Sequence, residues 1–300
     1  GVRLVERSAG AHDLVCGGFL GWDALARLER LGVDPAALGA RPITRLRLIA
    51  AGRRVEAELP HAAAGLSRRT LDEALRDRAA ACGAELVRGQ AIRSVDVAAR
   101  TLSLGEDALS ADALILASGK HELRGSARPI DPARALSIGL RTSFGGAPDL
   151  AGVIELHLFR HGYGGLLLQE DGRTNFCLSV ERRRFAEAGG IQPFLHSLAG
   201  EAPGLLDRID GAAGTWETIA NVPYGWRAQA AAPGVYRVGD QAAVIASLAG
   251  DGVAIALASG MSAADGILNG EDAPSWQRRF ARRARRPVAA AELLRHAAEH

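Results

Sequence analysis

The feature that most constrains the fold is a short apolar run that ends in glycine and aspartate. Residues 235–238 have the composition of a buried strand, and Gly239 and Asp240 follow it at once. A glycine-rich turn around Gly250 then precedes a long small-residue run, 252–268, with helical spacing. A carboxylate at a strand's carboxyl end binds sugar hydroxyls, and the N-terminus of the next helix attracts anions. The pattern predicts a nucleotide-binding α/β unit, although a tight turn before a buried helix has the same signature.

The composition excludes several classes of protein. The 300 residues carry a formal net charge of +2, which indicates no general affinity for nucleic acid. The three cysteines, Cys16, Cys82 and Cys177, are too scattered for a disulfide framework or a metal site, so no metal is expected. The longest apolar stretch, 242–264, is interrupted by Asp251 and is a poor membrane span. No signal peptide is visible, and we expect a cytoplasmic protein.

Strand and helix patterns divide the chain into two interleaved parts. Strand–helix units occur at both ends, and a block of strands with antiparallel spacing lies between them. We expect a discontinuous nucleotide-binding domain (1–40, 61–125 and 228–270), a mainly antiparallel substrate domain (41–60 and 126–227) and a C-terminal helix (271–300).

The individual elements follow from the same patterns. The expected strands are 2–5, 43–50, 54–59, 85–87, 92–97, 101–104, 113–116, 136–142, 153–159, 165–169, 175–180, 215–222 and 235–238. The expected helices are 22–31, 67–82, 183–188, 192–198, 252–268 and 274–296. Proline removes a backbone donor, so the last helix should be kinked or broken at Pro287.

Glu6 ends the first apolar strand. In a dinucleotide-binding unit an acid there binds the adenosine ribose, and a G-x-G-x-x-G loop stands about 20 residues before it. That stretch would precede Gly1, so we expect the first strand and its phosphate-binding loop to be missing from this sequence. The alternative for Glu6 is a solvated acid at a strand end.

The glycine and aspartate positions resemble a known flavoprotein motif. Residues 235–243, followed by 250–260, are similar to the second FAD motif of the p-hydroxybenzoate hydroxylase class. The resemblance implies that Asp240 binds the ribityl chain of FAD. It also implies that the backbone of Gly252 and Val253 faces the isoalloxazine ring.

Further segments, in the right order along the chain, resemble the geranylgeranyl reductases and their bacterial relatives. Residues 15–18 resemble their Cys-Gly-Gly loop beside the flavin, and Arg68 opens a similar Arg-x-x-Phe-Asp helix start. The resemblance implies FAD as cofactor and a glutathione-reductase-like (Rossmann-type) FAD domain with an inserted substrate domain. The implied cofactor-binding residues are Glu6, Cys16, Gly17, Gly18, Arg68, Ile92, Gly119, Asp240, Gly250, Gly252 and Val253.

The chain departs from these families at three places. Residues 162–168 keep only the start of a Gly-Tyr-x-Trp-x-Phe-Pro pocket motif. Residues 118–121 lack the acid of the hydroxylase Asp-Gly motif, so NAD(P)H as electron donor stays open. Ala246 and Ser247 stand where a proline usually follows the Gly-Asp motif.

Two residues are candidates for catalysis. Cys16 could modulate the flavin or act as an acid, or it could be a small packing residue. His121 could serve as an acid–base group, or it could be a surface loop histidine. Tyr163, Tyr224 and Trp226 are candidates for the substrate pocket, and the last two could equally be core residues.

The C-terminal helix carries a run of arginines, namely Arg278, Arg279, Arg282, Arg283, Arg285 and Arg286. Such a face can touch anionic lipid, which would make the protein membrane-peripheral, or it can be merely solvated.

The resemblance implies an FAD-dependent oxidoreductase that reduces a carbon–carbon double bond of a hydrophobic lipid-, isoprenoid- or polyketide-like small molecule. One alternative is an FAD-dependent monooxygenase. The other is an inactive fragment, because without the first phosphate-binding loop residues 1–300 should not hold FAD tightly.

Overall fold

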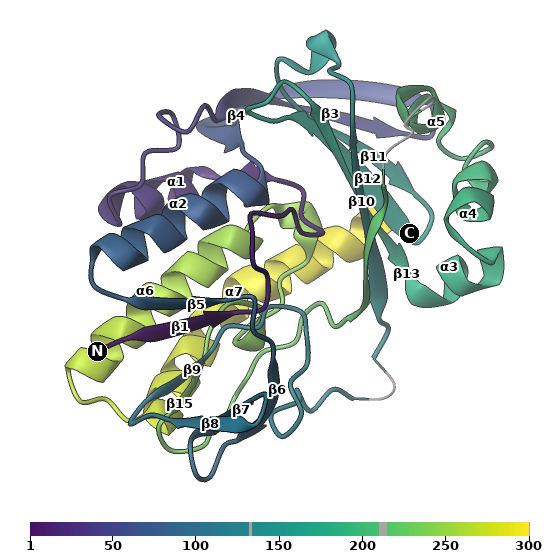
Figure 1. The fold of residues 1–300 in the computed structure, drawn as a ribbon. Coiled ribbons are helices and arrows are strands. Elements are labelled where there is room, and N and C mark those ends of the chain that lie inside the picture. Colours follow the sequence, from purple (N-terminus) through teal and green to yellow (C-terminus); the bar gives the residue numbers. More distant parts are fainter. Residues whose placement is uncertain (132–133, 210–214, 300) are drawn as a thin grey trace.

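The computed structural model describes residues 1–131, 134–209 and 215–299, and its strands form one large sheet and three small ones (Figure 1). The large sheet curls across one side of the molecule. Its strands stand in the order β14 (Glu217–Val222), β10 (Ser137–Phe144), β13 (Thr174–Glu181), β12 (Gly162–Leu168), β11 (Gly152–Phe159), β3 (Arg41–Ala50), β4 (Arg53–Gly65) and β2 (Phe19–Leu20). All neighbours are antiparallel except β11 and β3, which run parallel. The expected mainly antiparallel block is therefore present.

Three short helices cover the outer face of this sheet (Figure 1): α3 (Arg182–Ala188), α4 (Ile191–Ser197) and α5 (Pro203–Ile209). Because side chains alternate along a strand, every second residue points to these helices. Phe159, Leu166 and Phe176 pack there against Phe194 and Leu205 in one buried cluster. The opposite face of the sheet is turned to the rest of the chain.

The remaining strands form small sheets on the other side of the molecule. β1 (Arg3–Glu6) pairs in parallel with β5 (Glu85–Arg88), and β9 (Leu114–Leu116) pairs in parallel with β15 (Val235–Arg237). β6 (Ile92–Asp96), β7 (Thr101–Leu104) and β8 (Asp107–Ser110) form an antiparallel sheet. Parallel pairs bring the carboxyl ends of their strands to the same edge, which is where nucleotide ligands bind.

Four helices accompany these strands: α1 (Trp22–Arg30), α2 (Arg68–Ala81), α6 (Gly252–Leu268) and α7 (Ala273–Glu299). The Ser67 hydroxyl accepts a hydrogen bond from the Thr70 N–H, which caps α2 as the sequence predicts. α6 contacts both α1 and α7. Among the described residues no helix is long and apolar enough to cross a membrane.

Some boundaries differ from the sequence-based expectation. β4 continues to Gly65, beyond the predicted end at residue 59. β8 and α5 were not expected at all. The predicted break at Pro287 is wrong, because α7 continues through it as one helix; a kink at Pro287 stays a prediction. Ala284 and Val288, on the two sides of the proline, are both buried in the core, which favours a continuous helix over a break. His300, the last residue of the expected 271–300 segment, lies outside the described residues.

The division into domains stays a prediction. The large sheet contains strands from residues 41–65 and from residues 137–222. The predicted substrate domain comprises 41–60 and 126–227, so these strands lie within it except for the end of β4.

Candidate functional site

The carboxyl ends of β9 and β15 lie together and are tied by buried side chains. Arg128 donates to the backbone oxygens of Asp240 (3.1 Å) and Lys120 (2.7 Å). The side-chain amide of Gln241 donates to the carbonyls of Gly119 (2.9 Å) and His121 (3.0 Å). These bonds fix the loop after β9 against the turn after β15, so the strand-end residues form one rigid edge.

Asp240 faces Lys120 at this edge. Lys120 Nζ lies 3.5 Å from Asp240 Oδ2, and the two side chains are 26% and 24% exposed. The charge of Asp240 raises the pKa of Lys120, more than burial lowers it. Lys120 is the only lysine of the chain and was not among the predicted site residues. The sequence could have pointed to Lys120, because Lys120 directly follows Gly119, which is a predicted site residue.

Open backbone lies beside this pair at Gly119 and at the start of α6. Gly119 has a φ of +62°, and a Cβ there would stand 4.0 Å from Asp240 Oδ2, inside the space beside the carboxylate. Gly252 opens α6, and no atom lies within 4 Å of where its Cβ would be. Gly250, at φ +76°, instead packs against the ring of Phe19, where a Cβ would come within 2.8 Å. The arrangement offers a partly exposed carboxylate at Asp240 and open backbone at Gly252.

The predicted Cys-Gly-Gly loop is held against the large sheet. The side-chain amide of Asn175 donates to the carbonyls of Cys16 (3.1 Å) and Gly17 (2.8 Å). Gly18, at φ +70°, has no room for a side chain, because a Cβ would meet Gln169 Nε2 at 2.9 Å. At Gly17, as at Gly252, no atom lies within 4 Å of where a Cβ would be. The loop therefore presents exposed backbone while its far side is fixed.

Two further predicted residues lie near this loop or the strand edge. Arg68 makes a bidentate pair with Asp72, with both N–O distances 2.8 Å, and its charge interacts with Cys16. His121 lies 3.1 Å from Arg7 and is exposed. Partial desolvation lowers the pKa of His121, and the charges of Arg7 and Lys120 lower it further. A catalytic role for His121 stays a prediction.

A cluster of hydroxyl groups joins the sheet to the turn before α6. Ser247 Oγ lies 2.6 Å from the Tyr224 hydroxyl and also hydrogen-bonds the Tyr163 hydroxyl. Ser179 Oγ lies 3.3 Å from the Tyr224 hydroxyl. Tyr224 and Trp226 both pack in the buried C-terminal core, and Arg128 lies over the Trp226 ring at 5.7 Å. Ser247 belongs to this cluster. In the sequence it is notable only because it stands where a proline usually follows the Gly-Asp motif.

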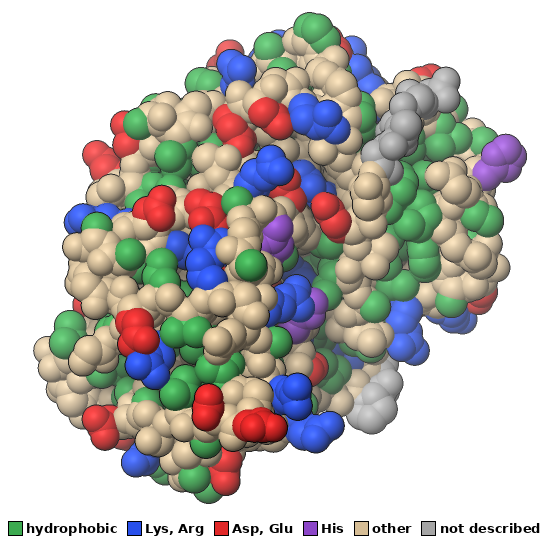
Figure 2. Space-filling model, viewed as in Figure 1, with side chains coloured by type: hydrophobic (Ala, Val, Ile, Leu, Met, Phe, Trp, Pro, Cys, Tyr) green, Lys and Arg blue, Asp and Glu red, His purple; other side chains and the backbone are tan. Residues whose placement is uncertain are grey.

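Glu6 lies at the carboxyl end of β1. Its carboxylate accepts from the Ser8 N–H at 2.8 Å and pairs with Arg76 at 3.3 Å. Burial raises the pKa of Glu6, but these two partners outweigh it and the pKa lies below its ordinary value. The Gln90 N–H donates to the Glu6 carbonyl, so the segment leading to Ile92 lies beside it. Charged side chains gather around the loop after β1 in the middle of the face seen in Figure 2.

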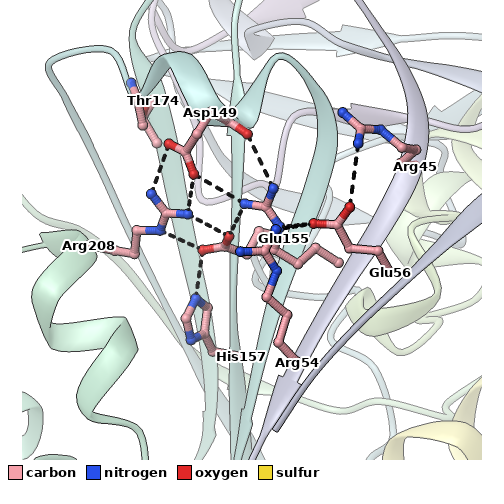
Figure 3. A network of polar contacts seen from close by, with 10 residues as sticks. Arg45, Arg54, Glu56, Asp149, Glu155, His157, Thr174 and Arg208 are labelled. Atoms are coloured by element: carbon pink, nitrogen blue, oxygen red, sulfur yellow. Dashed lines mark hydrogen bonds and ion pairs between the residues drawn. The ribbon is translucent and has the colours of Figure 1, made fainter. Parts of the chain in front are cut away.

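A second charged cluster lies on the outer face of the large sheet (Figure 3). The fully buried Glu155 accepts from Arg47 (2.7 Å), from Arg208 (2.8 Å) and from His157 Nε2 (2.8 Å). Burial alone would raise the pKa of Glu155, but these bonds hold it far below its ordinary value. Arg208 also binds Asp149, so the cluster fastens α5 to the sheet.

Comparisons with known proteins show what this fold is similar to. A scan against protein-family models and a search of curated proteins found no match. PqsL from Pseudomonas aeruginosa, a probable FAD-dependent monooxygenase, is 16% identical, with a TM-score of 0.71 over 99% of this chain and 90% of that one. A geranylgeranyl bacteriochlorophyll reductase-like protein from Thermoplasma acidophilum is 17% identical, with a TM-score of 0.77 over 98% and 80%. The flavin-dependent brominase Bmp2 is 14% identical, with a TM-score of 0.73 over 98% and 77%.

The chain therefore has the mixed α/β fold shared by these flavoproteins. The resemblance read from the sequence is confirmed at the level of the fold. The roles of the individual residues stay predictions.

Proposed function

We propose that the protein is an FAD-dependent oxidoreductase. The observation that carries the proposal is the strand edge at which Asp240 lies beside Gly119 and the Gly239 turn packs against α6 at Ala256 and Ser259. These groups suit FAD: Asp240 accepts from ribityl hydroxyls, Gly252 and Gly17 leave room for the flat ring, and Glu6 is placed at a strand end for the ribose. FAD, when bound, supplies the two-electron chemistry.

In this proposal the residues of the chain position the ligands. Arg128 and Gln241 keep the two strand ends in register, so Asp240 meets the ribityl chain without rearrangement. Lys120 places a positive charge beside the same position. Ser247 and Tyr224 offer hydroxyl protons at the boundary between this edge and the large sheet. The proposed reaction is reduction of a carbon–carbon double bond in a lipid-, isoprenoid- or polyketide-like molecule.

Flavin retention tests the cofactor assignment. Asp240→Ala should weaken FAD binding by about 10- to 150-fold, because a charged hydrogen-bond acceptor is worth roughly 1.5–3 kcal/mol. Titration with FAD, followed by quenching of flavin fluorescence, measures the affinity. Asp265→Ala is the matched control, since Asp265 is an exposed aspartate toward the other end of α6. Equal affinities of the two variants would contradict the assignment.

A monooxygenase is the second candidate, favoured by the fold shared with PqsL. Oxygen uptake by the reduced protein separates the two reactions. We expect uptake that does not depend on substrate. Substrate-stimulated uptake with a hydroxylated product would replace the reductase by the monooxygenase.

A further inference from the structure

Four hydroxyl groups form a continuous chain between the large sheet and the turn before α6. Ser247 Oγ hydrogen-bonds the Tyr163 hydroxyl and lies 2.6 Å from the Tyr224 hydroxyl. Ser179 Oγ lies 3.3 Å from the Tyr224 hydroxyl and ends the chain. The two tyrosines and Ser179 are buried, each at most 5% exposed, whereas Ser247 is exposed. The hydroxyl chain therefore has three buried members and one that reaches the surface.

The hydroxyl chain has more protons than hydrogen bonds. Each hydroxyl has one proton to donate and can accept two hydrogen bonds. Four protons share the three contacts, and these hydroxyls make no other hydrogen bond among the described residues. One proton is therefore left over, and it must point out of the hydroxyl chain.

Burial decides which hydroxyl carries the free proton. A buried donor without an acceptor is destabilising, whereas an exposed donor can bond to water. Ser179 therefore donates to Tyr224, and Tyr224 donates to Ser247. Tyr163 also donates to Ser247, and it keeps its proton because burial raises its pKa well above the ordinary value. Ser247 then accepts two hydrogen bonds, and its own proton points outward.

Positive charge surrounds the middle of the hydroxyl chain. The charge of Asp240, and to a smaller extent the Tyr224 hydroxyl, raise the pKa of Lys120, so the ammonium group acts on this tyrosine. The guanidinium group of Arg295 lies over the Tyr224 ring, 5.8 Å from its centroid. A nearby cation polarises an O–H bond, and a hydroxyl that accepts hydrogen bonds becomes a stronger donor itself. Both effects strengthen the outward donor at Ser247.

Ser247 lies on the turn that leads to open backbone. It begins the short helical turn η3 (Ser247–Ala249), and α6 starts at Gly252. No atom lies within 4 Å of where a Cβ of Gly252 would be. The free donor and the open backbone at which the proposed function expects the flat ring therefore belong to one turn.

We propose that Ser247 donates a hydrogen bond to the carbonyl oxygen of the substrate, and that the substrate is an α,β-unsaturated carbonyl compound. This deepens the proposed function, on which it rests for the source of the hydride. Hydride adds to the β carbon, the π electrons of the C=C bond move toward oxygen to give an enolate, and a proton from water adds to the α carbon. A donor already fixed at that oxygen stabilises the negative charge that develops there. An isolated double bond has no such oxygen, so the donor selects the conjugated substrate.

Infrared spectroscopy of a bound enone tests the donor. The probe is benzalacetone with an isotope label at the carbonyl carbon, bound to the whole chain 1–300 with FAD added and without it. Its C=O stretching frequency should be lower in wild type than in Ser247→Ala, because a hydrogen bond weakens the C=O bond. Binding should be about 2- to 12-fold tighter in wild type, the effect of one neutral hydrogen bond. Ser247→Thr keeps the hydroxyl and should restore both values. Ser197→Ala, at an exposed serine of α4, is the matched control and should behave as wild type. Identical frequencies in wild type and Ser247→Ala would overturn the proposal.

Tyr163→Phe tests the direction of the protons. If Tyr163 donates to Ser247, its removal leaves a weaker donor, and the frequency shift of the probe should become smaller. If Ser247 instead donated to Tyr163, the same change would free the serine proton and enlarge the shift, which would also overturn the proposal. FAD affinity, measured on the same samples, reports separately on the proposed function. A carbonyl shift without FAD binding would sustain the donor and reject the proposed function, and FAD binding without a carbonyl shift would do the opposite.

Discussion

The Glu155 cluster and the Asp240–Lys120 pair are both groups of opposite charges, but they differ in how completely the charges are satisfied. Glu155 is fully buried and accepts hydrogen bonds from three side chains (Figure 3). Asp240 is partly exposed, and the one side chain that pairs with it among the described residues is Lys120, at 3.5 Å. A carboxylate with all its partners supplied by the protein stabilises the fold, whereas one with free acceptor positions can bind a ligand.

The largest effect should come from breaking the complete cluster. Glu155→Gln removes a charge that Arg47 and Arg208 share, and breaking a buried pair in this way costs about 3–5 kcal/mol. Urea unfolding measures the loss. Glu58→Gln, at an exposed position on the same sheet, should change stability by no more than about 0.5 kcal/mol. FAD affinity should be the same in both variants. A small loss of stability in Glu155→Gln would mean that the cluster does not hold α5 against the sheet.

The same cluster predicts how stability depends on pH. The pKa of Glu155 in the folded protein lies well below its ordinary value of 4.5. Its contribution is therefore complete above the unfolded-state pKa and is lost as pH falls through that value toward the folded pKa. The stability difference between wild type and Glu155→Gln should be constant from neutral pH down to about pH 5.5 and shrink below about pH 4.5. A difference that persisted unchanged at pH 3 would contradict the assignment.

A smaller effect should come from the incomplete pair. Lys120→Gln removes a positive charge that faces Asp240 but leaves both positions partly solvated, so stability should change by less than about 1 kcal/mol. In the proposed holoprotein, loss of the cation should lower the flavin midpoint potential on the order of 30 mV, or about 1.4 kcal/mol for a two-electron couple. Spectroelectrochemical titration measures this shift. Lys120→Arg is the matched control and should retain the potential. An unchanged potential in Lys120→Gln would place Lys120 away from the ring.

The two clusters also show which parts of the structure a sequence can predict. The strand before Gly239 and Asp240 and the helix after Gly252 follow from local patterns, and both are present nearly at the predicted positions. The contact of Arg128 with the Asp240 backbone could not be predicted, because Arg128 comes from more than a hundred residues away, whereas Lys120 directly follows the predicted Gly119. Glu155 and His157 alternate with Leu156 and Leu158, so the strand was predictable. Which face of this strand is buried could not be predicted, since polarity alone would place the leucines inside and Glu155 and His157 outside.

The smallest effect concerns four arginines of α7 that, among the described residues, form no ion pair, unlike Arg279, which pairs with Glu271, and Arg295, which pairs with Glu292. Arg282, Arg283, Arg285 and Arg286 are exposed. Replacing Arg285 and Arg286 by Gln should leave stability within about 0.5 kcal/mol, because exposed charges away from any network contribute little. If this face touches anionic lipid, the same change should weaken binding to phosphatidylserine vesicles by about 1 kcal/mol for each arginine. Cosedimentation at low and moderate salt measures it, and neutral phosphatidylcholine vesicles are the control. Equal binding of wild type and variant to both kinds of vesicle would indicate that these arginines form a solvated surface that does not bind lipid.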